Sequence, residues 1–424
     1  MANSDAGNGE RGAILVVGGG IAGVTCAIEA AEAGFEVVLV EKSAYLGGHV
    51  AAFHRYFPKL CPPPCGLEID FRRVQNNPRV TVYTLAQLES LSGSAGNYEA
   101  VIRIAPRFAT PACTLCGECE RVCPAEISDA FNCGITKTKA IRLPHRMAFP
   151  AQYVVERSAC PEGCHLCVDA CRYNAIDLTQ KETRKTLRVA SVVLATGWEP
   201  YDAAKIDNLG FGQFPNVVTN VMLERMAAAD GPTSGRILRP SDGKPPRAVA
   251  FVQCAGSRDR NHLPYCSGVC CTASLKQATY LRSQYPEAKI TMFYIDLRTP
   301  GQLEEFAAKT IAANGVELIK GKVGKVQEQP GSRDLLVSAE DVLGRRKIAR
   351  EYDLVVLAVG IVPQSGGMPA GVQLDEFGFA ADSGRGVYAA GCLKRPAEVA
   401  VSIRDATGAA LKAIGSVGNR EHHG

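Results

Sequence analysis

The chain has 424 residues, of which 46% are hydrophobic, and its 47 basic and 43 acidic side chains leave a net charge of +4. This near balance gives no broad field that would indicate binding to nucleic acid or to an anionic membrane. No apolar run reaches the roughly 18 to 20 residues that a membrane span needs, and the polar, acidic first dozen residues lack a signal-peptide pattern. We therefore expect a cytoplasmic protein of about two to three domains.

The 17 cysteines are clustered at short spacings. In a small secreted domain such a number would indicate disulfides, but in a long chain without a signal peptide it indicates metal binding. Iron–sulfur ligation is therefore favoured over disulfides.

A glycine-rich turn follows the first predicted strand, residues 13–17, and opens a helix over residues 24–33. Its glycines have the GxGxxG spacing in the strand, turn and helix context that this motif requires. The first permits the tight turn, the second lets backbone N–H groups approach a pyrophosphate, and the third lets helix and strand pack closely; they are Gly18, Gly20 and Gly23. The turn predicts a dinucleotide site.

The second predicted strand, residues 35–40, ends at Glu41, whose carboxylate is placed to accept hydrogen bonds from ribose hydroxyls. Residues 42–50 are similar to the segment of two-dinucleotide flavoproteins that runs under the pyrophosphate. This favours FAD over NAD, and the further residues assigned to the site are Lys42, Gly47, Gly48 and His49.

Cys61 and Cys65 flank three prolines. They could be a redox dithiol, a ligand pair or two structural thiols, and the prolines, which stiffen the loop, argue against a redox motif carried on a helix. Residues 80–85 and 98–104 are then predicted strands.

Two cysteine runs follow. The first, Cys113, Cys116, Cys119 and Cys123, has the C-x2-C-x2-C-x3-C-P spacing of bacterial ferredoxins, in which the fourth cysteine binds the other [4Fe-4S] cluster. The second run has one longer spacing and an arginine in place of proline. We expect the crossed sets Cys113, Cys116, Cys119 and Cys171 on one cluster and Cys160, Cys164, Cys167 and Cys123 on the other. Zinc is the alternative.

Residues 125–159, between the two runs, predict a docking surface or lid, in which we expect Cys133 to be structural. The strand at residues 187–194 then closes on Thr196 and Gly197, a turn found in many flavoproteins. Residues 227–246 are a Gly- and Pro-containing linker to the next domain.

From residue 247 the order of strands and helices is that of a nicotinamide-binding domain, but its glycine loop is absent. Four cysteines stand at that junction of strand and helix: Cys254, Cys266, Cys270 and Cys271. They predict a [4Fe-4S] cluster, with buried or reactive thiols as the alternative, and they count against NAD(P)H binding.

The last part of the chain has a predicted strand at 352–359, another at 386–391, and a final helix opening at Arg395 to Val399. In flavoproteins of this architecture the last strand ends in Gly-Asp and the helix N-terminus faces the flavin. Here the pair is Gly391 and Cys392, so the aspartate contact with the ribityl chain is lost or altered.

With these motifs placed, the sequence resembles the A subunits of heterodisulfide reductases over residues 13–413. The most specific part is the cysteine pattern within residues 253–276. The resemblance implies a thioredoxin-reductase-like α/β flavoprotein and places Lys276 near the reactive edge of the flavin. Within the family, we expect the short form found in heterodisulfide-reductase-like complexes of sulfur oxidisers.

The expected domains are an FAD-binding domain in three parts (11–110, 181–240 and 351–424), a ferredoxin-like insert (111–180) and a degenerate nicotinamide-type domain (245–350). The resemblance implies an electron-transfer protein with FAD and [4Fe-4S] clusters that works with B and C subunits in sulfur oxidation. A homodimer is expected because flavoproteins of this architecture usually dimerise. The alternatives are a stand-alone NAD(P)H-dependent disulfide reductase and a non-enzymatic scaffold.

Overall fold

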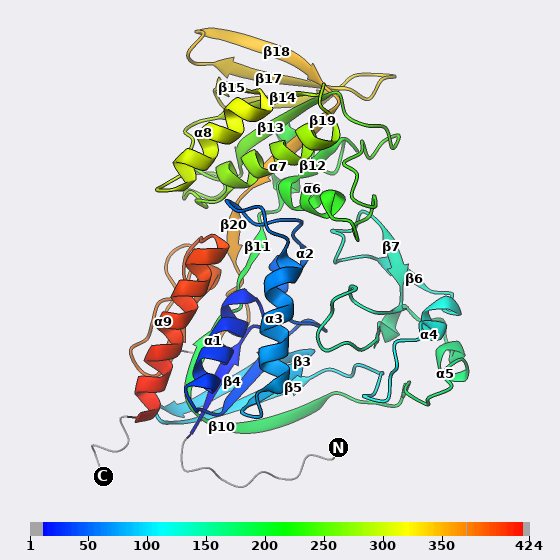
Figure 1. Cartoon of the computed structure of the whole chain (residues 1–424), viewed down its shortest axis with the longest axis vertical. Coiled ribbons are helices and arrows are strands. Elements are labelled where there is room, and N and C mark those ends of the chain that lie inside the picture. Colours follow the sequence, from blue (N-terminus) through cyan, green and yellow to red (C-terminus); the bar gives the residue numbers. More distant parts are fainter. Residues whose placement is uncertain (1–11, 370, 419–424) are drawn as a thin grey trace.

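The structure is a computed structural model that describes residues 12–369 and 371–418. Most of the polar N-terminal stretch therefore lies outside the described residues. The chain folds into two α/β lobes, one above the other in Figure 1, with an insert at the side of the lower one.

The lower lobe is built on a seven-stranded sheet in the order β3-β2-β1-β10-β5-β4, with β21 paired to β10. β10 is long enough for its first half to pair antiparallel with β5 and its second half to pair parallel with β1 and β21. The strands are β1 (Ala13–Val17), β2 (Val37–Glu41), β3 (Val80–Thr84), β4 (Ala86–Ser94), β5 (Asn97–Ile104), β10 (Thr183–Leu194) and β21 (Val387–Ala389).

Both faces of this sheet are covered, which explains why β1 is an unbroken apolar run. Ile14 and Val16 face the core shared with the helices, whereas Leu15 and Val17 face the core on the other side, next to β4 and β5. Figure 1 shows the helices on one face, and they are α1 (Ile21–Glu32), α2 (Gly48–Ala52), α3 (Pro63–Asn76) and α9 (Val399–Gly418). Doubly wound sheets bind ligands at the carboxyl ends of such parallel strands.

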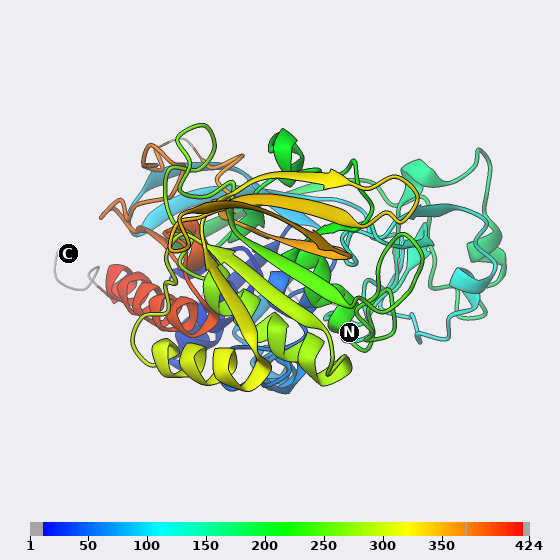
Figure 2. The same ribbon diagram turned by 90° about the horizontal axis from the view of Figure 1, so that it is seen from above.

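The upper lobe has a five-stranded parallel sheet in the order β12-β19-β13-β14-β15. It lies between helices and a three-stranded antiparallel sheet, as Figure 2 shows. The strands are β12 (Val217–Thr219), β13 (Ala248–Ala255), β14 (Lys289–Tyr294), β15 (Val316–Lys320) and β19 (Leu354–Val359); the smaller sheet has β16 (Val323–Glu328), β17 (Leu335–Asp341) and β18 (Arg346–Tyr352); the helices are α6 (Asn220–Ala227), α7 (Cys270–Gln284) and α8 (Leu303–Asn314).

The sheet membership of β12 and β19 differs from the predicted boundaries. Both strands lie in the upper sheet, whereas the sequence placed them in the FAD-binding parts 181–240 and 351–424. The physical reason is that a short, fully buried parallel strand carries the same apolar residues in either sheet.

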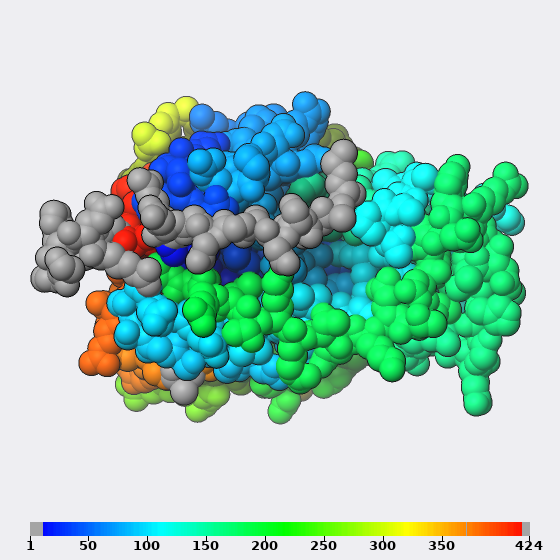
Figure 3. Space-filling view, turned by 90° about the horizontal axis from the view of Figure 1, so that it is seen from below, coloured from blue at the N-terminus to red at the C-terminus, as the bar shows by residue number. Residues whose placement is uncertain are grey.

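The segment between β5 and β10 forms a lobe of its own that projects from the side of the lower lobe (Figure 3). It contains two small hairpin sheets and two short helices around a core that includes cysteines. Its elements are α4 (Glu118–Arg121), β6 (Glu126–Ser128), β7 (Lys137–Lys139), β8 (Ile141–Arg142), β9 (Val154–Val155) and α5 (Leu166–Asp169).

Two short strands connect the upper and lower lobes. β11 (Trp198–Pro200) runs up and β20 (Ile361–Pro363) returns, and they pair antiparallel. Among the helices of the described residues, none combines the length and the apolar character needed to cross a membrane.

Candidate functional site

The glycine turn lies at the carboxyl end of β1, where α1 begins. A Cβ on Gly23 would lie 1.7 Å from the carbonyl oxygen of Gly18, so close packing of helix and turn depends on this glycine. Gly18 has φ +109° and is closed in by the backbone of Ala195. By contrast, a Cβ on Gly20 would meet no protein atom within 4 Å. Gly20 therefore faces open space at a helix N-terminus, the arrangement that suits a pyrophosphate.

The carboxylate of Glu41 lies under this turn. It is buried and accepts hydrogen bonds of 2.6 Å from the backbone N–H groups of Gly19 and Ser43. These bonds fix the position of the carboxylate at the end of β2. An oxygen that accepts one bond has capacity for another, so the predicted role toward a ribose is compatible with this geometry.

The residues predicted to run under the pyrophosphate follow β2 and pack against the glycine turn. The N–H of Gly47 donates to the carbonyl of Gly19 at 2.7 Å, and a Cβ on Gly48 would lie 3.1 Å from the Cα of Gly20. His49 stacks on Trp198 at 4.4 Å, with Nε2 2.8 Å from the Trp198 carbonyl, and burial lowers the pKa of His49. Lys42 is half exposed and pairs at 3.5 Å with Glu199.

Thr196 and Gly197 form the turn that follows β10, beside Gly18 of the glycine turn. The Thr196 hydroxyl donates to the carbonyl of Gln364 at 2.7 Å, and the N–H of Gln364 donates to the carbonyl of Gly197 at 3.0 Å. Gly197 has φ +79° and a Cβ there would meet nothing within 4 Å. The turn is therefore tied to β20 while its glycine faces open space.

Gly391, which precedes Cys392, lies next to α1. A Cβ on Gly391 would lie 2.9 Å from that of Ala22, and the N–H of Gly391 donates to the Asp405 carboxylate. Burial raises the pKa of the Cys392 thiol, which donates to the carbonyl of Ala397 at 3.3 Å. The thiol is thus engaged within its own loop.

The start of α9 at Val399 differs from the expected open helix N-terminus. The Glu398 carboxylate accepts hydrogen bonds from the N–H groups of Ala400 and Val401, at 2.9 and 3.1 Å. A carboxylate at this position satisfies first-turn donors and offsets the positive end of the helix. The sequence pattern did not lead us to expect this cap.

The four cysteines of the upper lobe gather where β13 ends and α7 begins. β13 is irregular here, with Cys254 at φ +58°, and α7 starts at Cys270. Burial, together with the neighbouring thiols of Cys271 and Cys266, raises the pKa of Cys254 to about 11. Burial likewise raises the pKa values of Cys270 and Cys271, with contributions from the other cysteines of the set. The structure therefore brings the four thiols into mutual electrostatic range.

Cysteine thiolates are the ligands that iron–sulfur clusters use, so the donor chemistry fits a cluster, and the N–H of Gly268 donates to the Cys266 sulfur at 3.4 Å. Burial raises these pKa values because it disfavours the charged thiolate. The positive charge of bound iron would stabilise the thiolate and so lower the pKa values. Within the described residues, no group of three or more His, Cys, Asp or Glu side chains is arranged to hold one metal ion. A cluster differs from a single ion because each cysteine binds its own iron.

Lys276, on the same helix, is buried rather than solvated as a helix lysine is by default. Its Nζ lies 2.8 Å from the carboxylate of Glu224 and donates to the carbonyl of Arg55 at 2.7 Å. The rings of Phe53 and Phe57 lie within 6 Å. The cysteine-bearing helix is therefore attached directly to the lower lobe.

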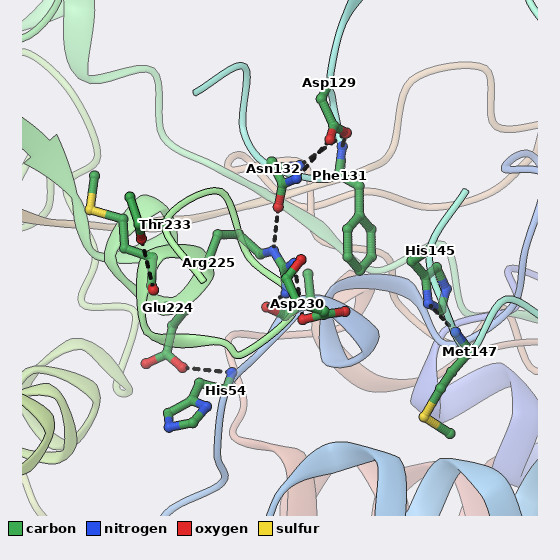
Figure 4. Close-up of polar contacts among 12 residues, drawn as sticks. His54, Asp129, Phe131, Asn132, His145, Met147, Glu224, Arg225, Asp230 and Thr233 are labelled. Carbon is green, nitrogen blue, oxygen red and sulfur yellow. Dashed lines mark hydrogen bonds and ion pairs between the residues drawn. The ribbon is translucent and has the colours of Figure 1, made fainter. Parts of the chain in front are cut away.

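Glu224 and Arg225 of α6 are site residues that sequence reasoning missed. Glu224 also accepts from the backbone N–H of His54 at 3.1 Å, whereas Arg225 donates to the side chain of Asn132 at 3.0 Å and to the carbonyl of Ala52 at 3.1 Å (Figure 4). The sequence carries no signal for them, because two neighbouring charges on a short helix are typical of a solvated surface.

Arg225 also lies over the ring of Phe131 at 4.4 Å, and Phe131 stacks on His145 at 4.6 Å (Figure 4). Cys133 is half-buried beside this contact, where burial raises its pKa, as suits the structural role predicted for it. One arginine side chain thus holds the upper lobe, the lower lobe and the insert together.

The cysteines of the insert form two groups. A pocket is lined by Cys123 of the first run and by Cys160, Cys164 and Cys167 of the second. Elsewhere, burial raises the pKa of Cys119 to about 12, with contributions from Cys113 and Cys116. The Cys171 sulfur accepts from the N–H of Ala175 at 3.3 Å. Cys123 of the first run thus shares a pocket with three cysteines of the second run.

Cys61 and Cys65 are both exposed and lie at the start of α3. The sequence places both cysteines in a loop, whereas α3 begins at Pro63, so Cys65 lies in its first turn and Cys61 precedes the helix. The reason is that Pro63 stands at the first helical position, where its missing N–H has no helical partner to lose.

Comparison with known proteins agrees with this geometry. A family model described as FAD dependent oxidoreductase matches residues 13–58. The thioredoxin reductase of T. acidophilum has a TM-score of 0.54 at 15% identity, covering 95% of this chain and 97% of that one. That of Lactococcus lactis has 0.53 at 12% identity, covering 96% and 99%. The fold is therefore that of the thioredoxin reductases, as predicted.

Relatives of higher identity specify the family. The A subunit of the ferredoxin/F420H2-dependent CoB-CoM heterodisulfide reductase of Methanosarcina acetivorans is 37% identical over 96% of this chain and 53% of its own length. An iron-sulfur A subunit of the CoB–CoM heterodisulfide reductase of Methanopyrus kandleri is 36% identical over 94% and 63%. The chain is thus similar over almost its whole length to A subunits of heterodisulfide reductases, and it spans between about half and two-thirds of the length of these relatives.

Proposed function

We propose that the chain is an electron-transfer flavoprotein that binds FAD in the lower lobe and [4Fe-4S] clusters in the upper lobe and the insert. FAD exchanges one or two electrons and each cluster exchanges one, so a chain with both links two-electron chemistry to single-electron flow. The observation that carries the proposal is α7, which presents Cys270 and Cys271 at its start and attaches to the lower lobe through Lys276.

Different residues of the chain would bind FAD and the clusters. Gly18, Gly20, Gly23 and Glu41 would hold the pyrophosphate and ribose of FAD, and the sets Cys254, Cys266, Cys270, Cys271 and those of the insert would hold clusters. Lys276 is supported as a flavin neighbour by its contact with the segment around Arg55, which follows the predicted FAD residues 42–50. In that position its ammonium would stabilise negative charge on a reduced ring.

The similarity to these A subunits supports a place in a larger complex. The relatives are named as A subunits. We further propose that this chain works with B and C subunits that carry disulfide or sulfur chemistry, in the cytoplasm and in sulfur oxidation. A homodimer is part of the same proposal.

The test is iron and flavin quantification on anaerobically prepared protein. A Cys270→Ala, Cys271→Ala variant is expected to lose one cluster, about four irons per chain, and to keep its FAD. A Cys116→Ala, Cys167→Ala variant is expected to lose the clusters of the insert. Cys26→Ala, which changes a buried thiol in α1, is the matched control and should keep all the iron. Unchanged iron in the first variant would refute the upper site.

The alternative, an NAD(P)H-dependent disulfide reductase, is favoured by the exposed pair Cys61 and Cys65 on a thioredoxin-reductase-like fold. It requires flavin reduction by NAD(P)H. Anaerobic stopped-flow mixing of the FAD-loaded protein with NADH or NADPH separates the two functions, and the electron-transfer proposal expects no direct reduction of the flavin.

A further inference from the structure

A polar pocket of about 350 Å³ opens beside Cys266 in the upper lobe. Its lining is rich in arginine and consists of Arg258, Asp259, Arg260, Pro264, Cys266 and Arg298. None of the functions proposed above uses the arginines of this pocket.

The position of the pocket in the fold is that of a ligand site. Arg258, Arg298 and Lys322 come two to four residues after the ends of β13, β14 and β15, which are neighbouring parallel strands. Doubly wound sheets bind ligands in the crevice outside the carboxyl ends of such strands. Three successive strand ends thus each supply a cation at this edge.

The charges near the pocket do not cancel. Asp259 accepts a hydrogen bond of 2.5 Å from Lys322, which lowers the pKa of this carboxyl, so the pair is neutral together. Arg258 pairs with Asp296 at 2.9 Å through one terminal nitrogen. Its other terminal nitrogen, Nη1, is buried without a hydrogen-bond partner among the described residues. Among the Arg, Lys and Asp side chains at the pocket, the exposed Arg260 and Arg298 then leave an excess of positive charge.

We propose that this pocket binds the oxyanion group of a small molecule, a phosphate or a sulfonate, through Arg260 and Arg298 with Arg258 behind them. Guanidinium groups bind such anions through paired, charge-assisted hydrogen bonds. The pocket borders the cluster site proposed at Cys254, Cys266, Cys270 and Cys271, because Cys266 belongs to both. Its ligand would lie next to the Cys266 sulfur. The oxyanion could be a free ion or the phosphate of a nucleotide.

Isothermal titration calorimetry on anaerobic holoprotein at constant ionic strength tests the proposal, with inorganic phosphate, methanesulfonate and ADP as probes. Saturable binding of phosphate or methanesulfonate at one site per chain is expected. Arg298→Gln and Arg260→Gln should each weaken it by about tenfold, the loss of one charge-assisted contact. Arg404→Gln, an exposed arginine of α9, is the control and should bind as the parent does.

ADP distinguishes the two sources. Binding of ADP at least about tenfold tighter than phosphate, and equally sensitive to Arg298→Gln, identifies a nucleotide phosphate; equal or weaker binding identifies a free oxyanion. The absence of saturable binding by every probe up to about 10 mM, or binding that both arginine variants leave unchanged, overturns the proposal. Iron content and circular dichroism of the variants show whether the lobe is intact.

Discussion

Glu224 and Lys276 form an ion pair of 2.8 Å in which the two side chains are only 5% and 4% exposed. The pair joins α6 to α7, and the Arg55 carbonyl and the Gln277 side chain complete the hydrogen bonding. Removing one partner leaves the other charged and buried. We expect Lys276→Met or Glu224→Ala to lower the free energy of unfolding by about 3 to 5 kcal/mol.

Chemical denaturation followed by circular dichroism measures this effect. Lys309→Met is the matched control, because it removes a lysine from the exposed pair with Glu305 and should cost at most about 1 kcal/mol. The double variant Lys276→Met, Glu224→Gln should recover part of the loss, since no unpaired charge remains. Equal effects of Lys276→Met and Lys309→Met would contradict the buried pair.

Arg225→Met is expected to loosen the insert. The guanidinium contacts Asn132 in the insert and Ala52 in the lower lobe, and no methionine atom can replace these donors (Figure 4). Limited proteolysis should then cut residues 125–159 several times faster than in the parent. Arg146→Met, at an exposed arginine of the same segment, should leave the cleavage rate unchanged. Cleavage that is equal in the two variants would count against the contact.

Gly20→Ala and Gly23→Ala should fail in different ways. The Cβ at Gly23 would overlap the carbonyl of Gly18, so this variant should be destabilised by several kcal/mol. The Cβ at Gly20 meets no protein atom, so that variant should fold normally but lose flavin, because the methyl occupies the space proposed for the pyrophosphate. Flavin absorbance and melting temperature separate the two effects. A Gly20→Ala protein with full flavin would show that the ligand lies elsewhere.

The pocket of the insert predicts which cysteines share a cluster. Cys123 and Cys164 line the same pocket, although they belong to different runs. Cys123→Ala and Cys164→Ala should therefore each remove about four irons, and the double variant should lose no more than either single one. Cys123→Ala combined with Cys116→Ala should instead lose about eight irons. Iron analysis of the four proteins decides between the crossed and the uncrossed sets.

His145 gives a pH dependence with a defined sign. Burial lowers its pKa from 6.5 to about 4, and its Nε2 has no hydrogen-bond partner among the described residues. The unfolded chain therefore binds a proton at higher pH than the folded one. Stability is retained above pH 6.5 and lost as the pH falls toward 4, by about 1 kcal/mol at pH 5.5. In denaturation at pH 7.5 and 5.5, His145→Phe should show that much less loss than the parent.

The glycine turn and its surroundings could be predicted from the sequence because each of these residues is dictated by local geometry. The run at residues 13–17 became β1 with unchanged bounds, and α1 opens at the glycines. Cysteine spacing likewise indicated Cys254 and Cys271 as one group. These features are determined by neighbours along the chain, which sequence patterns record.

The contacts between the lobes could not be predicted, since they depend on how separate parts of the chain pack. Nothing local distinguishes Glu224 and Arg225 from surface charges, and the burial of Lys276 follows only from the position of Arg55. The same holds for β12, whose partner β19 lies more than a hundred residues further along the chain. The Glu398 cap on α9 was missed for another reason, because a glutamate next to a helix start is equally typical of a solvated surface residue.

The pairing of β11 with β20 has a mechanical consequence. The chain leaves the lower lobe at residues 198–200 and re-enters it at 361–363, and these two crossings are hydrogen-bonded to each other. This two-stranded connection is therefore the covalent link between the lobes. Lys276 and Arg225 make additional contacts between the lobes at a distance from it along the chain. Rotation of the upper lobe about the β11–β20 pair would change the distance between the cysteines of α7 and the glycine turn, while the internal structure of each lobe stayed the same.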